Sequence, residues 1–220
     1  MLKSETKNKN FEPVPAGNHL AILTQIIDLG HQEVTWQGQT KLQPKIRLTW
    51  ELPNETKTFE GVEKPLVIGG QYTNSMGSLA RLRPIIEGML GVQLRDEEAA
   101  NFDMDSYKEL LGKPCSLTVM HKIGADGKTY ANVATVAPLM KGVKVPKQFN
   151  ENVIYEIGTS SDEVLQKLPE FIRKQIAKAD ENQSGLSDVN RDALERIMAG
   201  DNKVQSRKVE DEIDPADIPF

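Results

Sequence analysis

The chain has 220 residues, 38% of them hydrophobic, which is enough for one domain of ordinary size and an additional segment. It contains no apolar run near 18 residues, and its N-terminus lacks the apolar core of a signal peptide, so we expect neither a membrane span nor secretion. The single cysteine, Cys115, excludes an internal disulfide framework and predicts a reducing compartment, the cytoplasm.

Charge is distributed unevenly along the chain, whose net charge is −5. Residues 1–150 hold 18 Lys and Arg against 16 Asp and Glu, whereas residues 151–220 hold 9 against 16. The first part is therefore mildly basic and the last part strongly acidic. The basic part permits contact with nucleic-acid phosphates, although it lacks the strongly basic stripe that usually marks such proteins.

Residues 1–18 are polar and end in a Pro-Val-Pro-Ala-Gly-Asn run, which predicts a flexible N-terminal arm. Apolar residues then recur in patterns that predict three strands, at 19–29, 44–52 and 64–73. In the first strand, apolar residues occur at both odd and even positions. Because these positions face opposite sides of a sheet, we expect both faces of the strand to be partly apolar.

The second of these strands has the clearest period of two. Its two alternating sets are expected to take opposite faces of the sheet. The set expected to face the core is Ile46, Leu48, Trp50 and Leu52, and the set expected outside is Lys45, Arg47, Thr49 and Glu51.

A helical period follows the third strand. Residues 75–90 repeat apolar side chains every 3.6 residues, with Pro84 expected to kink or restart the helix and Gly91 to end it. A second short helix is predicted over 105–111, with Asp105 as its N-cap.

Two further strands are predicted at 114–123 and 128–136, joined by a Gly-Ala-Asp-Gly turn. Three strands, a helical insert and a two-stranded hairpin occur in the order of the OB-fold, a five-stranded β-barrel. We therefore predict a mainly β fold of this kind over 19–145, and the alternative is an open α+β sheet.

The last third of the chain differs in character. Residues 146–208 read as a linker with short helices at 168–178 and 188–198, which could pack on the barrel, on each other or on a second subunit of a homo-oligomer. Residues 209–220 form an acidic tail too charged to fold alone, which is expected to be disordered.

The end of this tail is either a frayed terminus or a tethered ligand for another protein. Its apolar side chains would enter a pocket, while its carboxylates meet basic residues. The residues expected to bind the partner are Asp214, Asp217, Ile218, Pro219 and Phe220.

The sequence contains no pattern that predicts catalysis, so we expect no enzyme, cofactor or metal. The three histidines are scattered and show no zinc-binding spacing. Asp103 and Asp105 could hold a divalent ion in a metal-dependent nuclease, but turn and cap roles are favoured.

Single-stranded nucleic acid is bound by cations that meet phosphates and by flat side chains that stack on bases. For Trp36 and Tyr72, stacking and packing within the protein are about equally favoured. The candidates outside the core are Trp36, Lys45, Arg47, Tyr72, Lys122, Lys128 and Tyr130.

The Asp-Ile-Pro-Phe end at 217–220 resembles that of bacterial single-stranded DNA-binding proteins, whose tip docks replication and repair proteins. The stretches 15–19, 28–30, 46–53, 112–115 and 127–133 resemble bacteriophage-encoded OB-fold single-stranded DNA-binding proteins.

This resemblance implies sequence-tolerant binding of single-stranded DNA for phage replication or recombination in the bacterial host cytoplasm. It also implies that the tail recruits a polymerase, primase, helicase or nuclease. The alternative is a protein-interaction or DNA-mimic module that acts on a host protein without binding nucleic acid.

Overall fold

The molecule is built on one mostly antiparallel sheet, which a computed structural model describes together with its flanking helices over residues 12–179. Its order is β3-β2-β1-β4-β5, and β6 pairs in parallel with β1. The strands are β1 (Gly17–Trp36), β2 (Gln39–Phe59), β3 (Val62–Thr73), β4 (Pro114–Ile123), β5 (Thr129–Ala137) and β6 (Val153–Tyr155). The mainly β fold is confirmed, and each of the five expected strands overlaps a strand of the sheet. However, β1 and β2 extend well beyond the expected 19–29 and 44–52, so that only a two-residue turn connects them.

The sheet curls so that β3 contacts β5. Within the described residues, however, no hydrogen-bonded ladder joins these two strands, so the sheet is open. The closed barrel therefore stays a prediction.

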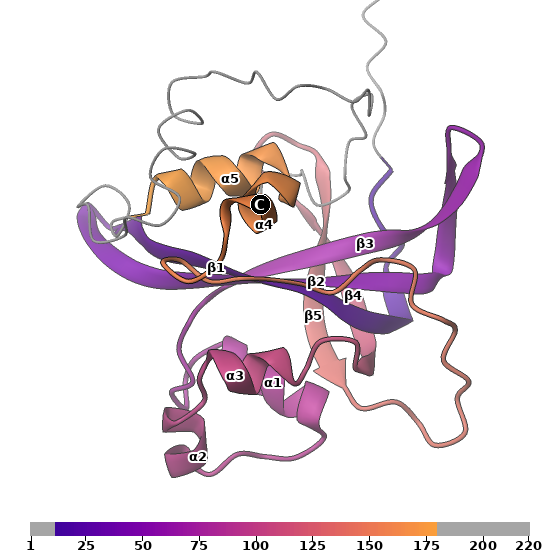
Figure 1. Cartoon of the computed structure of the whole chain (residues 1–220), viewed down its shortest axis with the longest axis horizontal. Coiled ribbons are helices and arrows are strands. Elements are labelled where there is room, and N and C mark those ends of the chain that lie inside the picture. The colour runs from indigo at the N-terminus through magenta and orange to yellow at the C-terminus, as the bar shows by residue number, and fades with distance from the viewer. Residues whose placement is uncertain (1–11, 180–220) are drawn as a thin grey trace, which may run out of the picture.

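Helices cover both faces of the sheet, with α1, α2 and α3 on one face and α4 and α5 on the other (Figure 1). Their bounds are α1 (Leu82–Leu90), α2 (Asp96–Ala100), α3 (Met104–Lys108), α4 (Asp162–Lys167) and α5 (Glu170–Ala177). The helical insert between the third and fourth strands is confirmed, and α5 matches the helix expected at 168–178. The short β6 and α4 were not expected from the sequence.

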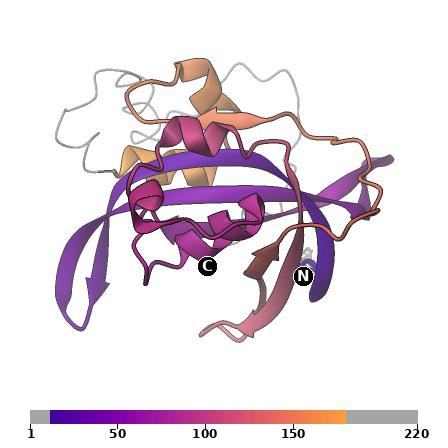
Figure 2. The same cartoon turned by 90° about the horizontal axis from the view of Figure 1, so that it is seen from below.

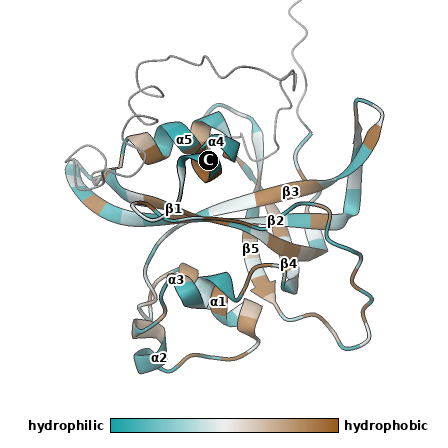
Figure 3. Ribbon diagram, viewed as in Figure 1, coloured by the Kyte–Doolittle hydropathy of each residue, from teal (hydrophilic) through white to brown (hydrophobic). Residues whose placement is uncertain are grey.

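Each helical layer covers a separate hydrophobic core, and in Figure 3 the hydrophobic parts of the strands gather between the two layers. The first core lies between the sheet and α1, and includes Ile46, Leu48, Trp50, Leu52, Cys115, Leu117 and Val119. The second lies between β1 and the C-terminal elements, and consists of Ile27, Leu29, Tyr155, Leu165, Leu168, Ile172, Ile176 and Ala177. The expected core face of the second strand is confirmed.

A β-bulge lets β1 serve both cores. The register with β2 passes from Leu23 opposite Trp50 to Gln25 opposite Thr49, which leaves one extra residue on β1. An extra residue shifts the alternation of side chains by one. As a result Leu23 and Ile26 enter the first core, whereas Ile27 enters the second. The expectation that both faces of this strand are apolar is confirmed.

The predicted solvent-exposed face of β2 is wrong for three of its four residues. Arg47, Thr49 and Glu51 are all buried, and only Lys45 keeps part of its surface in water. The cause is tertiary, because α5 and the chain around residues 149–150 cover this face. Sequence periodicity distinguishes the two faces of a strand but does not show what covers each of them.

The first helix of the insert is shorter than predicted. α1 covers the second half of the expected span 75–90, and Pro84 lies in its first turn, where a missing N–H breaks no helical hydrogen bond. Gly91 ends the helix with a φ of 72°, as expected. A Cβ at Gly88 would lie 2.0 Å from the carbonyl oxygen of Val136, so glycine lets α1 pack closely on β5.

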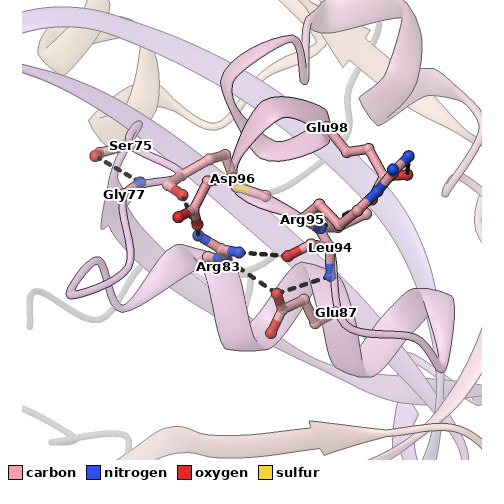
Figure 4. A network of polar contacts seen from close by, with 9 residues as sticks. Ser75, Gly77, Arg83, Glu87, Leu94, Arg95, Asp96 and Glu98 are labelled. Carbon is pink, nitrogen blue, oxygen red and sulfur yellow. Dashed lines mark hydrogen bonds and ion pairs between the residues drawn. The ribbon is translucent and has the colours of Figure 1, made fainter.

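Arg83 connects α1 to the loop that follows it (Figure 4). Its Nε donates to Glu87 Oε1 at 3.0 Å, and its Nη1 donates to Asp96 Oδ1 at 2.6 Å. Its Nη2 donates to the carbonyl of Leu94, whose own N–H donates to Glu87 at 3.0 Å. The Arg83 bond holds the pKa of Glu87 below its ordinary value, so the Glu87 carboxylate is charged at neutral pH.

The expected domain limits fall partly within packed structure. Val14, inside the expected arm 1–18, is buried. The elements β6, α4 and α5 follow residue 145 and share a core with β1. The helix expected at 188–198 and the tail 209–220 lie outside the described residues.

Candidate nucleic-acid interface

The β4–β5 hairpin brings three of the seven predicted nucleic-acid contacts together. Lys122 is directly opposite Tyr130 in the antiparallel ladder, and Lys128 precedes β5 at the end of the turn. The turn closes through a 2.8 Å bond from the N–H of Gly124 to the carbonyl of Lys128, and Gly127 has a φ of 76°. We call Lys122, Lys128 and Tyr130 the hairpin cluster.

Tyr130 is held in place across the turn. Its hydroxyl donates to Asp126 Oδ2 at 2.8 Å, and a Cβ at Gly124 would lie 2.5 Å from its ring. The ring therefore lies against the backbone of Gly124 and is only partly covered. A fixed and partly exposed aromatic ring is the kind of surface on which a base can stack.

Both lysines of the hairpin cluster are exposed, and they differ in their surroundings. Lys128 Nζ lies 3.5 Å from Asp126 Oδ2, while Lys122 has no ion-pair partner among residues 12–179. The hydrogen bond from Tyr130 lowers the pKa of Asp126 and raises the pKa of the Tyr130 hydroxyl. Asp126 is therefore charged at neutral pH and partly neutralises Lys128.

Exposed apolar side chains accompany these charges on the same hairpin. Met120 and Ile123 expose 60% and 73% of their surfaces. Large apolar groups of this exposure on a projecting hairpin are available to contact the faces of unpaired bases.

Lys45 belongs to a separate polar group on β2 and β3. Its ammonium donates to Gln43 Oε1 and to Thr73 Oγ1, both at 2.9 Å. Partial burial lowers the pKa of Lys45. Trp36 is at the end of β1, where its backbone pairs with Gln39 in the β1–β2 hairpin.

Tyr72 and Arg47 do not lie on an open surface. Tyr72 is buried in the first core, and burial raises its pKa to about 12. Arg47 is also buried, with its guanidinium carbon 5.2 Å from the centroid of the Phe171 ring. Of the two alternatives for Tyr72, stacking on a base or packing within the protein, the structure therefore favours packing. The prediction that Arg47 points outward is wrong.

Sequence reasoning missed two residues that shape these surfaces. Asp126 was read only as part of a turn, yet its carboxylate fixes Tyr130. Phe171 lies in the helix expected at 168–178, and its ring covers Arg47 on the outer face of β2. The Gly-Ala-Asp-Gly pattern could have predicted a local hydrogen bond to Asp126, since Asp side chains commonly bond nearby groups in turns.

The acidic pair considered as a metal site has structural roles. Asp103 caps α3 by accepting bonds from the N–H and the hydroxyl of Ser106, at 2.9 and 2.8 Å. The expectation that Asp105 is this cap is wrong, because Asp105 lies inside the helix and pairs with Lys108 at 2.7 Å. Residues 12–179 contain no group of three or more His, Cys, Asp or Glu that could hold a metal ion.

Two of the histidines fasten the chain that precedes β1. His19 bonds to the carbonyl of Pro15 at 2.8 Å and to Glu55 Oε1 at 3.0 Å. His121 bonds to the carbonyl of Val14 at 2.8 Å. These contacts tie the chain before β1 to the sheet.

Comparison with models of known protein families finds no match, and comparison with curated proteins finds none either. In the part of the chain that the structure describes, no helix has the length and apolar character needed to cross a membrane.

Proposed function

We propose that this chain is a sequence-tolerant single-stranded DNA-binding protein with an OB-fold and no catalytic step. The sheet order β3-β2-β1-β4-β5, with helices inserted between β3 and β4, supports this fold because it is the connectivity of the OB-fold. OB-folds bind oligonucleotides with the face of strands 2 and 3 and with the loops between strands 1 and 2 and strands 4 and 5. The corresponding hairpins project toward the same side of the molecule in Figure 2.

The hairpin cluster is the observation that carries the proposal. A ring fixed against Gly124 stacks on a base without reading its identity, since every base has a flat face. The ammonium groups of Lys122 and Lys128 meet phosphates and release the counterions that surround the strand. Neither interaction requires a particular sequence, which suits a protein that coats DNA during phage replication or recombination.

The acidic tail 209–220 has a separate role in this proposal. Its carboxylates and its apolar side chains recruit a polymerase, primase, helicase or nuclease, because acidic motifs are recognised by clusters of basic side chains on a partner. Deletion of 209–220 is expected to leave or raise the affinity for DNA and to abolish partner binding. Partner binding that survives the deletion contradicts this role.

Substitutions in the hairpin cluster test the DNA-binding proposal. Tyr130→Ala is expected to weaken binding of a labelled oligo-dT by about 1–3 kcal/mol, the contribution of one stacked base. Tyr130→Phe keeps the ring and is the matched control, with affinity close to that of the unmodified protein. Equal affinities of the Ala and Phe variants contradict stacking by Tyr130.

The two lysines provide a second test. The double variant K122Q/K128Q is expected to reduce the salt dependence of DNA binding. Each lost phosphate contact lowers the slope of log affinity against log salt concentration by about 0.7 for a single strand. The control pair K57Q and K108Q changes the net charge equally, at exposed sites outside the hairpin cluster. A protein-interaction module would bind no oligonucleotide in either form.

A further inference from the structure

The loop between β5 and β6 is an exposed basic segment, and we call residues 138–150 the lysine strap. In Figure 1 it runs along the right-hand side of the molecule, from the lower end of β5 to β6. It carries Lys141, Lys144 and Lys147 at intervals of three residues, and residues 140–147 are all exposed. Between Asp126 and Glu151 the sequence contains no acidic residue.

Both ends of the lysine strap are attached to the folded body. At its start, Pro138 packs near Gly91, since a Cβ there would lie 3.5 Å from the proline ring. At its end, the buried carboxylate of Glu51 accepts bonds from the N–H of Phe149 at 3.0 Å and the N–H of Asn150 at 2.8 Å. The Asn150 side-chain amide donates to the same carboxylate at 2.8 Å.

The three lysine side chains between these anchors are not held in place by ion pairs with any residue that the structure describes. No carboxylate pairs with Lys141, Lys144 or Lys147 within residues 12–179. Phe149 exposes 56% of its surface, although Glu51 fixes its backbone. The lysine strap therefore presents three cations without ion-pair partners among these residues and one exposed aromatic ring whose backbone is fixed. Cations and aromatic rings are the two kinds of side chain that bind single-stranded nucleic acid.

The covering of β2 favours a contact surface outside strands 2 and 3. OB-folds usually bind along strands 2 and 3, but here Phe171 of α5 lies over Arg47 on that part of the sheet. At that part of the sheet a bound strand cannot reach Arg47, so contacts elsewhere are favoured. Attachment at both ends also reduces the ordering cost of binding, because the segment is already constrained before it meets its ligand.

We infer that the lysine strap is a second contact surface for the phosphate backbone and bases of single-stranded DNA, with Phe149 as its stacking residue. This inference rests on the proposed function. The lysine strap and the hairpin cluster lie at opposite ends of β5, whose nine residues span about 30 Å. One strand that reaches both surfaces therefore follows much of the length of the molecule.

The test compares a strap variant, K141Q/K144Q/K147Q, with a control variant, K57Q/K108Q/K113Q, in the full-length protein. Both remove three exposed lysines, so they change the net charge equally. Binding of labelled oligo-dT is measured over a range of salt concentrations. The strap variant is expected to reduce the slope of log affinity against log salt by about 2, from about 0.7 for each phosphate contact, and the control to leave it unchanged.

Phe149→Ala adds a readout that does not depend on charge. Because Glu51 binds the backbone of residue 149, alanine keeps the anchor and removes only the ring. Affinity for oligo-dT is expected to fall between about 5-fold and 150-fold, the equivalent of one lost base stack.

The possible failures can be told apart. If the unmodified protein binds no oligonucleotide, the proposed function and this inference both fail. If it binds but the strap and control variants behave alike, the inference alone is overturned. The inference alone is also overturned if the strap variant binds oligo-dT as the unmodified protein does and loses only the binding of an acidic protein.

Discussion

The guanidinium carbon of Arg47 on β2 lies 5.2 Å from the centroid of the Phe171 ring on α5. On its other side Arg47 lies against β3, where a Cβ at Gly69 would be 2.2 Å from Nη2. The side chain is thus enclosed between the sheet and the C-terminal helix. Arg47 therefore holds α5 on the sheet and is not free to meet phosphates.

This contact predicts measurable coupling between β2 and α5. A double-mutant cycle of Arg47→Ala and Phe171→Ala, followed by urea unfolding, is expected to give a coupling energy of about 0.5–2 kcal/mol. Each single variant is expected to destabilise the protein, because each removes packing at the covered face. Strictly additive effects would show that the two side chains do not interact.

Glu51 predicts a second stability effect. Glu51→Ala is expected to lower the free energy of unfolding by about 3 kcal/mol, because it leaves two backbone N–H groups and one side-chain amide of the strap without their acceptor. Hydrogen exchange at the amides of Phe149 and Asn150 should accelerate in the same variant. Glu60→Gln is the control, since Glu60 is exposed, and its effect should stay within about 0.5 kcal/mol.

If exchange at these two amides is unchanged in Glu51→Ala, Glu51 does not anchor the lysine strap. The stability measurement alone cannot give this answer, whereas exchange reports on the anchored amides directly.

Cys115 provides a probe of the first core. It is fully buried, and burial raises the pKa of its thiol to about 12. Because only the thiolate reacts, a thiol reagent at pH 8 is expected to label the native protein far more slowly than the urea-unfolded protein. Equally fast labelling of the two states would mean that β4 does not face a closed core.

Tryptophan fluorescence separates the two tryptophans. Trp50 is fully buried in the first core, so bound DNA should not change its emission directly. If Trp36 stacks on bases, oligo-dT quenches the unmodified protein but not Trp36→Phe. Equal quenching of both proteins would remove Trp36 from the interface.

Local sequence patterns predicted the strands well, and the reason is visible in β2. Ile46, Leu48, Trp50 and Leu52 alternate without interruption and all enter the first core. The same pattern failed on the opposite face, because the groups that cover it come from distant segments. Glu51 meets Phe149 across 98 positions in the sequence, and no local pattern reports such a contact.

The candidate site was predicted in part for similar reasons. Lys122, Lys128 and Tyr130 lie within one hairpin, so strand parity and turn position were enough to group them. Tyr72 shares its parity with Ile68, and both are buried in the first core. The lysine strap has no periodic structure, and its two anchors are tertiary, so no local sequence pattern identified it as a contact surface.

The most direct measurement is the anisotropy of a labelled oligo-dT titrated with the full-length protein between 50 and 200 mM salt. If the five lysines of the hairpin cluster and the lysine strap each contact one phosphate, the slope is about −3.5 and the affinity falls by about 130-fold across this range. A duplex of the same length should bind more weakly, since its bases cannot stack on Tyr130. Absence of binding at 50 mM salt, or an affinity that does not change with salt, would contradict the account.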